Sequence, residues 1–240
     1  AIPGNHEFDF GMENFLSLVE GAKYQYICCN LLKDGKPVLD PYAIVDYGSC
    51  KVGYVGIATP ESLSKSDPTS FQDASGNFVY TFCESDGALY TAVQSAVDAA
   101  KADGADYVVA LAHLGQDGVN DPWTSSSVIA NTTGIDVVID GRSQEAYQRQ
   151  APNKEGEMIP LIQAGSGLES LGMVTLNPAT GEVSAQLLPL TGENVPVDED
   201  ALGYIRHITG QPETEPAPEP EPQPEPAPEP EPQPDPAPAP

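Results

Sequence analysis

The sequence predicts an α/β fold, because apolar strands and amphipathic helices alternate along the chain. Residues 107–112 form a continuous apolar run, and residues 135–139 are apolar except for Asp136. Both runs are typical of strands buried in a sheet. Residues 12–20 and 85–103 repeat their apolar side chains at helical spacing. About 210 residues precede a Pro-rich tail, and this length is sufficient for one α/β domain or most of one.

One helix and three strands are predicted in the first part of the chain. The helix over residues 12–20 has one apolar face and ends at Gly21. β-Rich or apolar runs predict strands over residues 24–30, 42–47 and 51–58. The turn residues Gly48-Ser49 indicate that the last two strands form a hairpin, and the Ser, Asp and Gly scattered through residues 61–85 predict a long loop.

The second part of the chain alternates helices with strands. Ser85 is a candidate cap for the helix over residues 85–103, and a short helix is predicted over residues 125–131. Further strand-like runs follow, over residues 158–164, 173–176 and 183–190. The buried strands over residues 107–112 and 135–139 both end in loops with polar side chains. Because open α/β sheets bind ligands beyond the carboxyl ends of their strands, these two loops are candidates for a binding site.

The stretch Gly4-Asn5-His6-Glu7-Phe8-Asp9 brings three chemically useful side chains into one loop. The side-chain oxygen of Asn5 is a good ligand for a hard divalent cation. His6 can donate a hydrogen bond to a phosphoryl oxygen, and Asp9 can orient and charge that imidazole. This loop therefore predicts a metal ligand, a transition-state donor and its orienting partner side by side.

Two later stretches extend this pattern. One strand ends in Ala112-His113-Leu114-Gly115, and the next ends in Asp140-Gly141-Arg142-Ser143-Gln144, with Pro122-Trp123-Thr124-Ser125 between them. Taken with the first loop, these motifs resemble in order and spacing those of the 5'-nucleotidase family of calcineurin-like metallophosphoesterases. The resemblance covers about residues 1–190.

The resemblance implies a fold and a metal centre. The family fold is a metallophosphoesterase-type β-sandwich flanked by helices, in four layers (αββα), and its site holds two divalent metal ions such as Zn²⁺ or Mn²⁺. By position, Asn5 and His113 would bind one metal, and Gln144 would reach the other. His6 would stabilise the transition state, and Asp9 would form a dyad with His6.

The chain departs from the family pattern in two ways. The family's Asp-x-His and bridging-Asp motifs should lie before Asn5, so we expect a domain that is incomplete at its N-terminus, with at most partial metal occupancy and impaired activity. Arg142 stands where the family has His, and a guanidinium has no lone pair to offer a metal. Arg142 can mark a site that holds its second metal abnormally, grip phosphate directly, or be neutral variation.

Net charge and hydropathy restrict the classes of molecule that the chain can bind. The formal net charge is −26 at pH 7, and the last thirty residues hold eight acidic side chains and no Lys or Arg, which leaves −18 on the rest. Such a chain would repel nucleic acids and anionic membranes. No run of about eighteen apolar residues exists, so no membrane span is predicted. A small nucleotide or phosphate ester can still bind where metals supply positive charge.

The remaining candidate residues have simpler interpretations. The cysteines Cys28, Cys29, Cys50 and Cys83 lack the spacing of a zinc site, so we interpret them as small buried hydrophobes, with a Cys50–Cys83 disulfide left open. Asp136 and Asp140 flank a buried strand, where we interpret them as solvated caps. His207 is predicted to lie at the surface.

Residues 211–240 are predicted to be an extended spacer, separate from a catalytic domain over residues 1–210. Proline at every second position forbids helices and sheet ladders, so the segment should adopt polyproline-II-like structure. A spacer suits attachment to a surface, although docking of this segment in an aromatic-lined partner is an alternative. Together with the family resemblance, the spacer indicates an extracellular or cell-surface protein, although no signal peptide is present in the sequence.

Two functions compete at this level. The first is metal-dependent hydrolysis of nucleotide phosphate monoesters, by attack of a metal-activated water on phosphorus. The second is a catalytically impaired phosphoesterase-like module that binds a partner at the end of a surface spacer. The missing upstream motifs and Arg142 favour the second function, and the three motifs in order favour the first.

Overall fold

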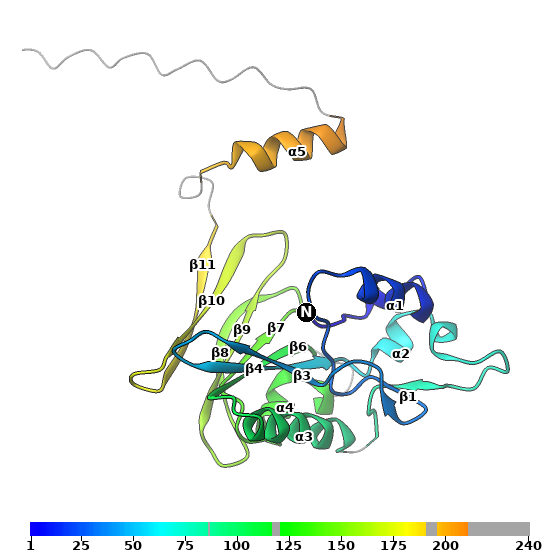
Figure 1. The fold of residues 1–240 in the computed structure, drawn as a ribbon, viewed down its shortest axis with the longest axis horizontal. Helices are drawn as coiled ribbons and strands as arrows, with labels where there is room; N and C mark the ends of the chain where they lie inside the picture. The colour runs from blue at the N-terminus through cyan, green and yellow to red at the C-terminus, as the bar shows by residue number, and fades with distance from the viewer. Residues whose placement is uncertain (86, 117–120, 191–195, 211–240) are drawn as a thin grey trace, which may run out of the picture. The chain divides into compact units, whose positions relative to one another are not determined.

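The computed structural model describes residues 1–85, 87–116, 121–190 and 196–210. Contacts divide the chain into two units, Ala1–Val195 and Pro196–Pro240. The first unit is built on a six-stranded mixed sheet with the strand order β3-β4-β6-β7-β9-β8 (Figure 1). The predicted α/β class is confirmed.

The central sheet has a parallel interior with an antiparallel strand at each edge. Its strands are β3 (Tyr42–Asp46), β4 (Lys51–Ala58), β6 (Tyr107–His113), β7 (Val137–Asp140), β9 (Met158–Ala164) and β8 (Ala146–Pro152). The predicted hairpin is confirmed, because β3 pairs with β4 in antiparallel register. In the parallel part, Ala58 pairs with His113 and Ala112 pairs with Asp140. The carboxyl ends of β4, β6 and β7 therefore meet at one edge of the sheet.

Helices cover one face of this sheet. The largest core cluster joins α3 (Ala88–Ala102) and α4 (Ser125–Ala130) to the apolar side chains of β4, β6 and β7. The predicted cap at Ser85 is wrong, because the residue that precedes the first turn of α3 is Gly87, with a φ of 71°. The other helix, α4, has a side-chain cap: the hydroxyl of Thr124 accepts a hydrogen bond from the backbone N–H of Ser127.

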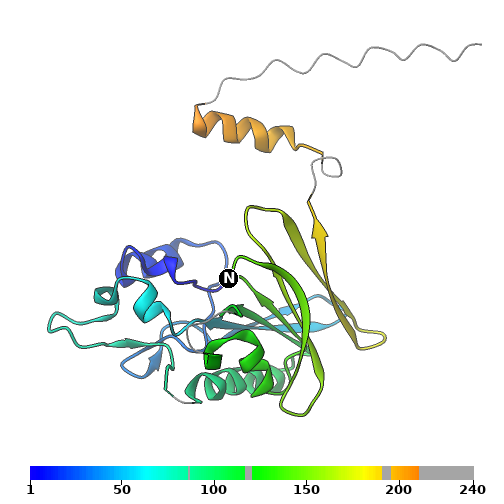
Figure 2. The same ribbon diagram turned by 180° about the vertical axis from the view of Figure 1, so that it is seen from behind.

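A second β layer covers the opposite face of the sheet. The antiparallel hairpin of β10 (Ser170–Asn177) and β11 (Glu182–Pro189) contributes Val174, Leu176 and Val183, which pack against Val52 and Val109 of the central sheet. The hairpin crosses the sheet in both views of the molecule (Figures 1 and 2). In the described residues, a helical layer and two β layers of the expected αββα arrangement are present.

The N-terminal segment packs around an aromatic cluster. The short 3-10 helix η1 (His6–Phe8) precedes α1 (Met12–Gly21), which agrees with the predicted helix. Phe8 is fully buried, and its ring centroid lies 5.2 to 5.5 Å from those of Phe15, Phe71 and Phe82. This cluster ties the loop that carries Asn5 and His6 to the rest of the domain.

The segment between α1 and α3 differs from the prediction. Residues 24–30 form only an isolated bridge, between Ile27 and Asp40, because their backbone bonds separate segments and not one strand; the N–H of Cys28 bonds Asp40 and that of Cys29 bonds Gly56. The predicted loop contains short elements. These are α2 (Ser62–Lys65), the 3-10 helix η2 (Pro68–Phe71) and β5 (Tyr80–Thr81), the last in a small sheet with β1 (Leu32–Lys33) and β2 (Lys36–Pro37).

Further elements outside the predicted loop were not expected. These are the edge strand β8, the helix α5 (Glu199–Thr209) and the short 3-10 helix η3 (Asp121–Trp123).

The predicted burial of the cysteines is confirmed only in part. Cys28 and Cys29 are buried, whereas Cys50 and Cys83 are only partly buried. All four are free thiols, so the Cys50–Cys83 disulfide that the sequence left open is absent.

The second unit contributes α5, whose N-cap Asp198 accepts a hydrogen bond from the backbone of Ala201. His207 lies on α5 and is exposed, as predicted. The predicted spacer over residues 211–240 lies outside the described residues. Within the part of the chain that the structure describes, no helix is long and apolar enough to cross a membrane.

Candidate active site

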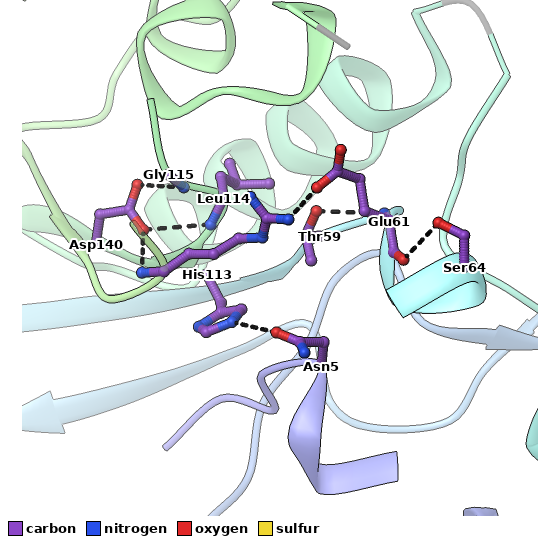
Figure 3. A network of polar contacts seen from close by, with 9 residues as sticks. Asn5, Thr59, Glu61, Ser64, His113, Leu114, Gly115 and Asp140 are labelled. Carbon is purple, nitrogen blue, oxygen red and sulfur yellow. Dashed lines mark hydrogen bonds and ion pairs between the residues drawn. The ribbon is translucent and has the colours of Figure 1, made fainter. Parts of the chain in front are cut away.

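Asn5 and His113 meet at the carboxyl edge of the central sheet. His113 is the last residue of β6, and its Nε2 atom lies 3.0 Å from Oδ1 of Asn5 (Figure 3). Because an amide oxygen can only accept, the imidazole Nε2–H is the donor in this arrangement. Both atoms belong to groups that bind metals well, and the sequence predicted that these residues share one ion.

The loop that carries Asn5 is fixed by backbone contacts and by close packing. Ser66 donates a hydrogen bond to the carbonyl oxygen of Asn5, and Ser70 donates one of 3.2 Å to that of Phe8. Gly4 lies directly against the His113 ring, since a Cβ atom placed on Gly4 would lie 3.0 Å from Cε1 of His113. Glycine at this position is therefore what lets the loop approach His113 so closely.

His6 and Asp9 form the predicted dyad at the surface of the same loop. Nδ1 of His6 lies 2.8 Å from Oδ2 of Asp9, and the His6 side chain is 82% exposed. A carboxylate on Nδ1 keeps the proton on that nitrogen and leaves Nε2 on the opposite side of the ring. In this structure the His6 ring is open to solvent and able to meet a substrate.

Burial keeps His113 neutral. Removal from water lowers the pKa of His113 below its ordinary value; the charge of Asp140 opposes this shift, and that of Arg142 reinforces it. A neutral imidazole has one lone pair, which lies on Nδ1 while Nε2–H donates to Asn5. Binding of an ion by Nε2 would therefore require this proton to move to Nδ1.

Asp140 organises the backbone behind His113, and its interpretation as a solvated cap is wrong. The residue is only 5% exposed, at the end of β7. Its carboxylate accepts hydrogen bonds from the backbone N–H groups of Leu114 (3.2 Å) and Gly115 (2.8 Å) (Figure 3). It also accepts one from the backbone N–H of Arg142 (3.2 Å) and one from the hydroxyl of Ser125. Asp140 thus holds the loops after β6 and β7 together, and these donors replace the water that a solvated carboxylate would have.

Arg142 pairs with Glu61, a residue that the sequence analysis did not single out. Nη2 of Arg142 contacts Oε2 of Glu61, and the side chains are 16% and 3% exposed, respectively. Glu61 follows β4, so the pair spans the strand end that carries His113. A glutamate in a Ser- and Asp-rich stretch gave no local signal, because its partner is 81 positions away.

Gln144 lies in the loop after β7 but is not joined to the other candidates. Its side chain is exposed and its φ is 59°. No hydrogen bond or ion pair among the described residues connects it with Asn5 or His113. The structure therefore assembles Asn5 with His113 and His6 with Asp9, and leaves the role of Gln144 as a prediction.

The donor set fits part of a two-metal centre. Asn5 Oδ1 and His113 Nε2 lie 3.0 Å apart, and both could bind one ion if the imidazole proton moved from Nε2 to Nδ1. Within the described ranges, no group of three or more His, Cys, Asp or Glu side chains could hold a metal ion. The residues described here thus fit one face of one metal site and do not supply the bridging carboxylate of a second.

Comparison with known proteins supports the resemblance found in the sequence. No family model matches the chain. It is 31% identical over 173 residues to a 2',3'-cyclic-nucleotide 2'-phosphodiesterase/3'-nucleotidase of Haemophilus influenzae, covering 65% of this chain and 24% of that protein. It is 28% identical over 196 residues to human 5'-nucleotidase, covering 72% of this chain and 31% of that protein. The chain thus spans only about a quarter to a third of these relatives.

The fold has a counterpart among solved structures. A calcineurin-like phosphoesterase of Bacillus subtilis superposes with a TM-score of 0.66 and 21% identity, over 87% of this chain and 69% of that one. At this identity the likeness concerns the fold. The predicted calcineurin-like architecture is confirmed.

Proposed function

Since the chain's relatives are 5'-nucleotidases and 2',3'-cyclic-nucleotide phosphodiesterase/3'-nucleotidases, and since its fold is that of calcineurin-like phosphoesterases, we propose that it carries part of a site that hydrolyses nucleotide phosphate monoesters. The observation that carries this proposal is the meeting of Asn5 with His113 beside the His6–Asp9 dyad. Nucleotide catabolism outside the cell is the corresponding role.

The residues would divide the chemistry among them. Asn5 and His113 would hold one divalent ion, and Gln144 would reach a second. Bound metals supply an activated water and neutralise charge on the phosphoryl oxygens. His6 would donate a hydrogen bond to a phosphoryl oxygen as charge develops on it, and Asp9 would hold the ring in the required tautomer.

A second candidate function is supported by a specific observation. Arg142 places a permanent positive charge within electrostatic reach of His113 and pairs with buried Glu61. Such a site would bind divalent metal poorly, and the module would then serve binding or interaction at a surface, presented by the segment over residues 211–240.

The test is phosphate release from adenosine monophosphate with Mn²⁺, measured on the full-length protein. His6→Ala should lower the rate by about 10²- to 10⁴-fold, since it removes a positioned donor. His207→Ala, on the exposed surface of α5, is the matched control and should leave the rate unchanged. Binding of nucleotide without any Mn²⁺-dependent release would favour the interaction module.

A further inference from the structure

We propose that Arg142, anchored by Glu61, binds a phosphate oxyanion directly, so that this site takes inorganic phosphate or the phosphoryl group of a monoester without a metal ion. The inference rests on the proposed function only in taking this sheet edge as the place where phosphate binds. Arg142 would then determine which ligand the site binds. Its presence where the family has His would serve phosphate binding.

The position of Arg142 supports this assignment. It follows β7, whose last residue Asp140 pairs with Ala112, directly before His113. The Asp140 carboxylate fixes the backbone N–H of Arg142, so the loop presents the side chain from a rigid base. Arg142 follows β7 and its partner Glu61 follows β4, so the pair lies across the end of β6, the strand between them, which carries His113.

Glu61 holds the guanidinium in place, and among the residues that the structure describes no second side-chain hydrogen bond of Arg142 is found. Glu61 engages Nη2 of Arg142. Nη1 lies next to Gly115, at 3.6 Å from the position of a Cβ atom there, and the φ of +73° at Gly115 favours glycine. A guanidinium has five N–H donors in a planar fork that matches phosphate geometry, and one carboxylate oxygen does not use them all.

A carboxylate partner makes the arginine a better receptor. A free arginine side chain loses rotamer freedom when it binds a ligand, whereas Arg142 is already ordered by Glu61 and by its loop. The carboxylates of Glu61 and Asp140 lie against Arg142 and offset part of its positive charge. They also repel a phosphate of charge near −2, so we expect modest affinity.

The test is a calorimetric titration of the full-length protein with inorganic phosphate in the presence of EDTA, which removes divalent metal ions. Saturable binding is expected, with at least a tenfold loss in Arg142→Gln. Arg142→Lys should bind with intermediate affinity, because it keeps the charge and loses the fork. Arg206→Gln, on α5, removes the same charge elsewhere and should bind as the wild type does.

A further variant separates binding from folding. Arg142→Gln leaves Glu61 buried without this partner, which can unfold the domain. The double variant Arg142→Gln/Glu61→Gln removes both charges, should fold, and should also lose phosphate. Wild-type protein that binds no phosphate in EDTA, or a folded double variant that binds it normally, would overturn the inference. Phosphate release from adenosine monophosphate with Mn²⁺ is measured in a separate experiment. Failure of hydrolysis would therefore count against the proposed function and leave the phosphate-binding test in EDTA unaffected.

Discussion

Oδ1 of Asn5 and Nε2 of His113 lie 3.0 Å apart although 108 positions separate the two residues in the chain. Two features of the fold bring them together. β6 ends at His113 on the carboxyl edge of the sheet, and the N-terminal loop is held over that edge by Phe8 and its aromatic neighbours. Because both side chains are supported from behind, their geometry is defined by packing as much as by the contact itself.

The close approach of Gly4 to His113 predicts a sensitive position. In Gly4→Ala the new methyl group would meet the His113 ring at 3.0 Å and Oε2 of Glu7 at 3.1 Å, so the ring or the loop must move. We expect Mn²⁺ affinity, measured by calorimetry on the full-length protein, to fall by about 10- to 100-fold, as it does when a ligand's support is lost. Gly21→Ala, which meets nothing within 4 Å, is the control. Equal affinities of both variants would show that the Gly4 contact does not position His113.

The aromatic cluster predicts a large difference between two phenylalanines of the same segment. Phe8 is fully buried, whereas Phe10 is 85% exposed. Phe8→Ala should lower the free energy of unfolding by about 3 to 5 kcal/mol, because it leaves a cavity among three other rings. Phe10→Ala should change it by less than about 0.5 kcal/mol. Urea unfolding followed by circular dichroism measures both, and a small loss for Phe8→Ala would contradict the packing described.

Substitution of Asp136 by Asn is expected to stabilise the protein at neutral pH and less so at acidic pH. Burial raises the pKa of Asp136 above its ordinary value of 3.8, against the hydrogen bond from the backbone of Val108. The native state therefore binds this proton more readily than the unfolded state, and stability is lost as the pH rises through the native pKa. Asp136→Asn removes the charge, so its melting temperature should exceed that of the wild type at pH 7, and the difference should shrink at pH 3.5.

Asp106 provides the control for this substitution. Its carboxylate accepts a comparable backbone hydrogen bond, 2.8 Å from Lys51, but the residue is exposed. Asp106→Asn should show no stabilisation at pH 7. If Asp136→Asn is destabilised at pH 7, the hydrogen bond from Val108 outweighs the effect of burial.

The thiols should differ sharply in reactivity. Burial raises the pKa of Cys28 to about 11, raises that of Cys29 well above its ordinary value, and raises that of Cys83. Cys28 and Cys29 are buried, whereas Cys50 and Cys83 are only partly buried. Ellman's reagent should therefore label at most two thiols rapidly in the native chain and four in denaturant, and Cys50→Ser/Cys83→Ser should remove the rapid phase. Rapid labelling that persists in this double variant would contradict the burial of Cys28 and Cys29.

The sequence indicated the parts of the site whose signals are local. The Asn5–His6–Asp9 spacing predicts the His6–Asp9 contact, and the strand before His113 predicts that this residue lies at the sheet edge. The pairing of Glu61 with Arg142 and the burial of Asp140 depend on contacts between strands that are distant in sequence. No spacing rule reveals them, because each side chain is explained only by its neighbours in the sheet.

The fold shows the same division between local and distant signals. Apolar runs predicted the buried strands β4, β6, β7 and β9, whereas β8 was missed because it is an edge strand with mostly exposed polar residues. Residues 27–30 are buried without forming a strand, because the backbone N–H groups of Ile27, Cys28 and Cys29 bond three separate segments, at Ala1, Asp40 and Gly56, and not one partner strand. Periodicity reports burial more directly than it reports pairing.

The most direct test of the proposed site is Mn²⁺-dependent phosphate release from adenosine monophosphate by the full-length protein and its Asn5→Ala and His113→Ala variants. If these residues hold one metal together, release requires Mn²⁺, and each substitution lowers kcat/KM at least about 100-fold while the fold persists. Release that proceeds unchanged in EDTA, or a folded variant of either residue that keeps the wild-type kcat/KM, would contradict the account.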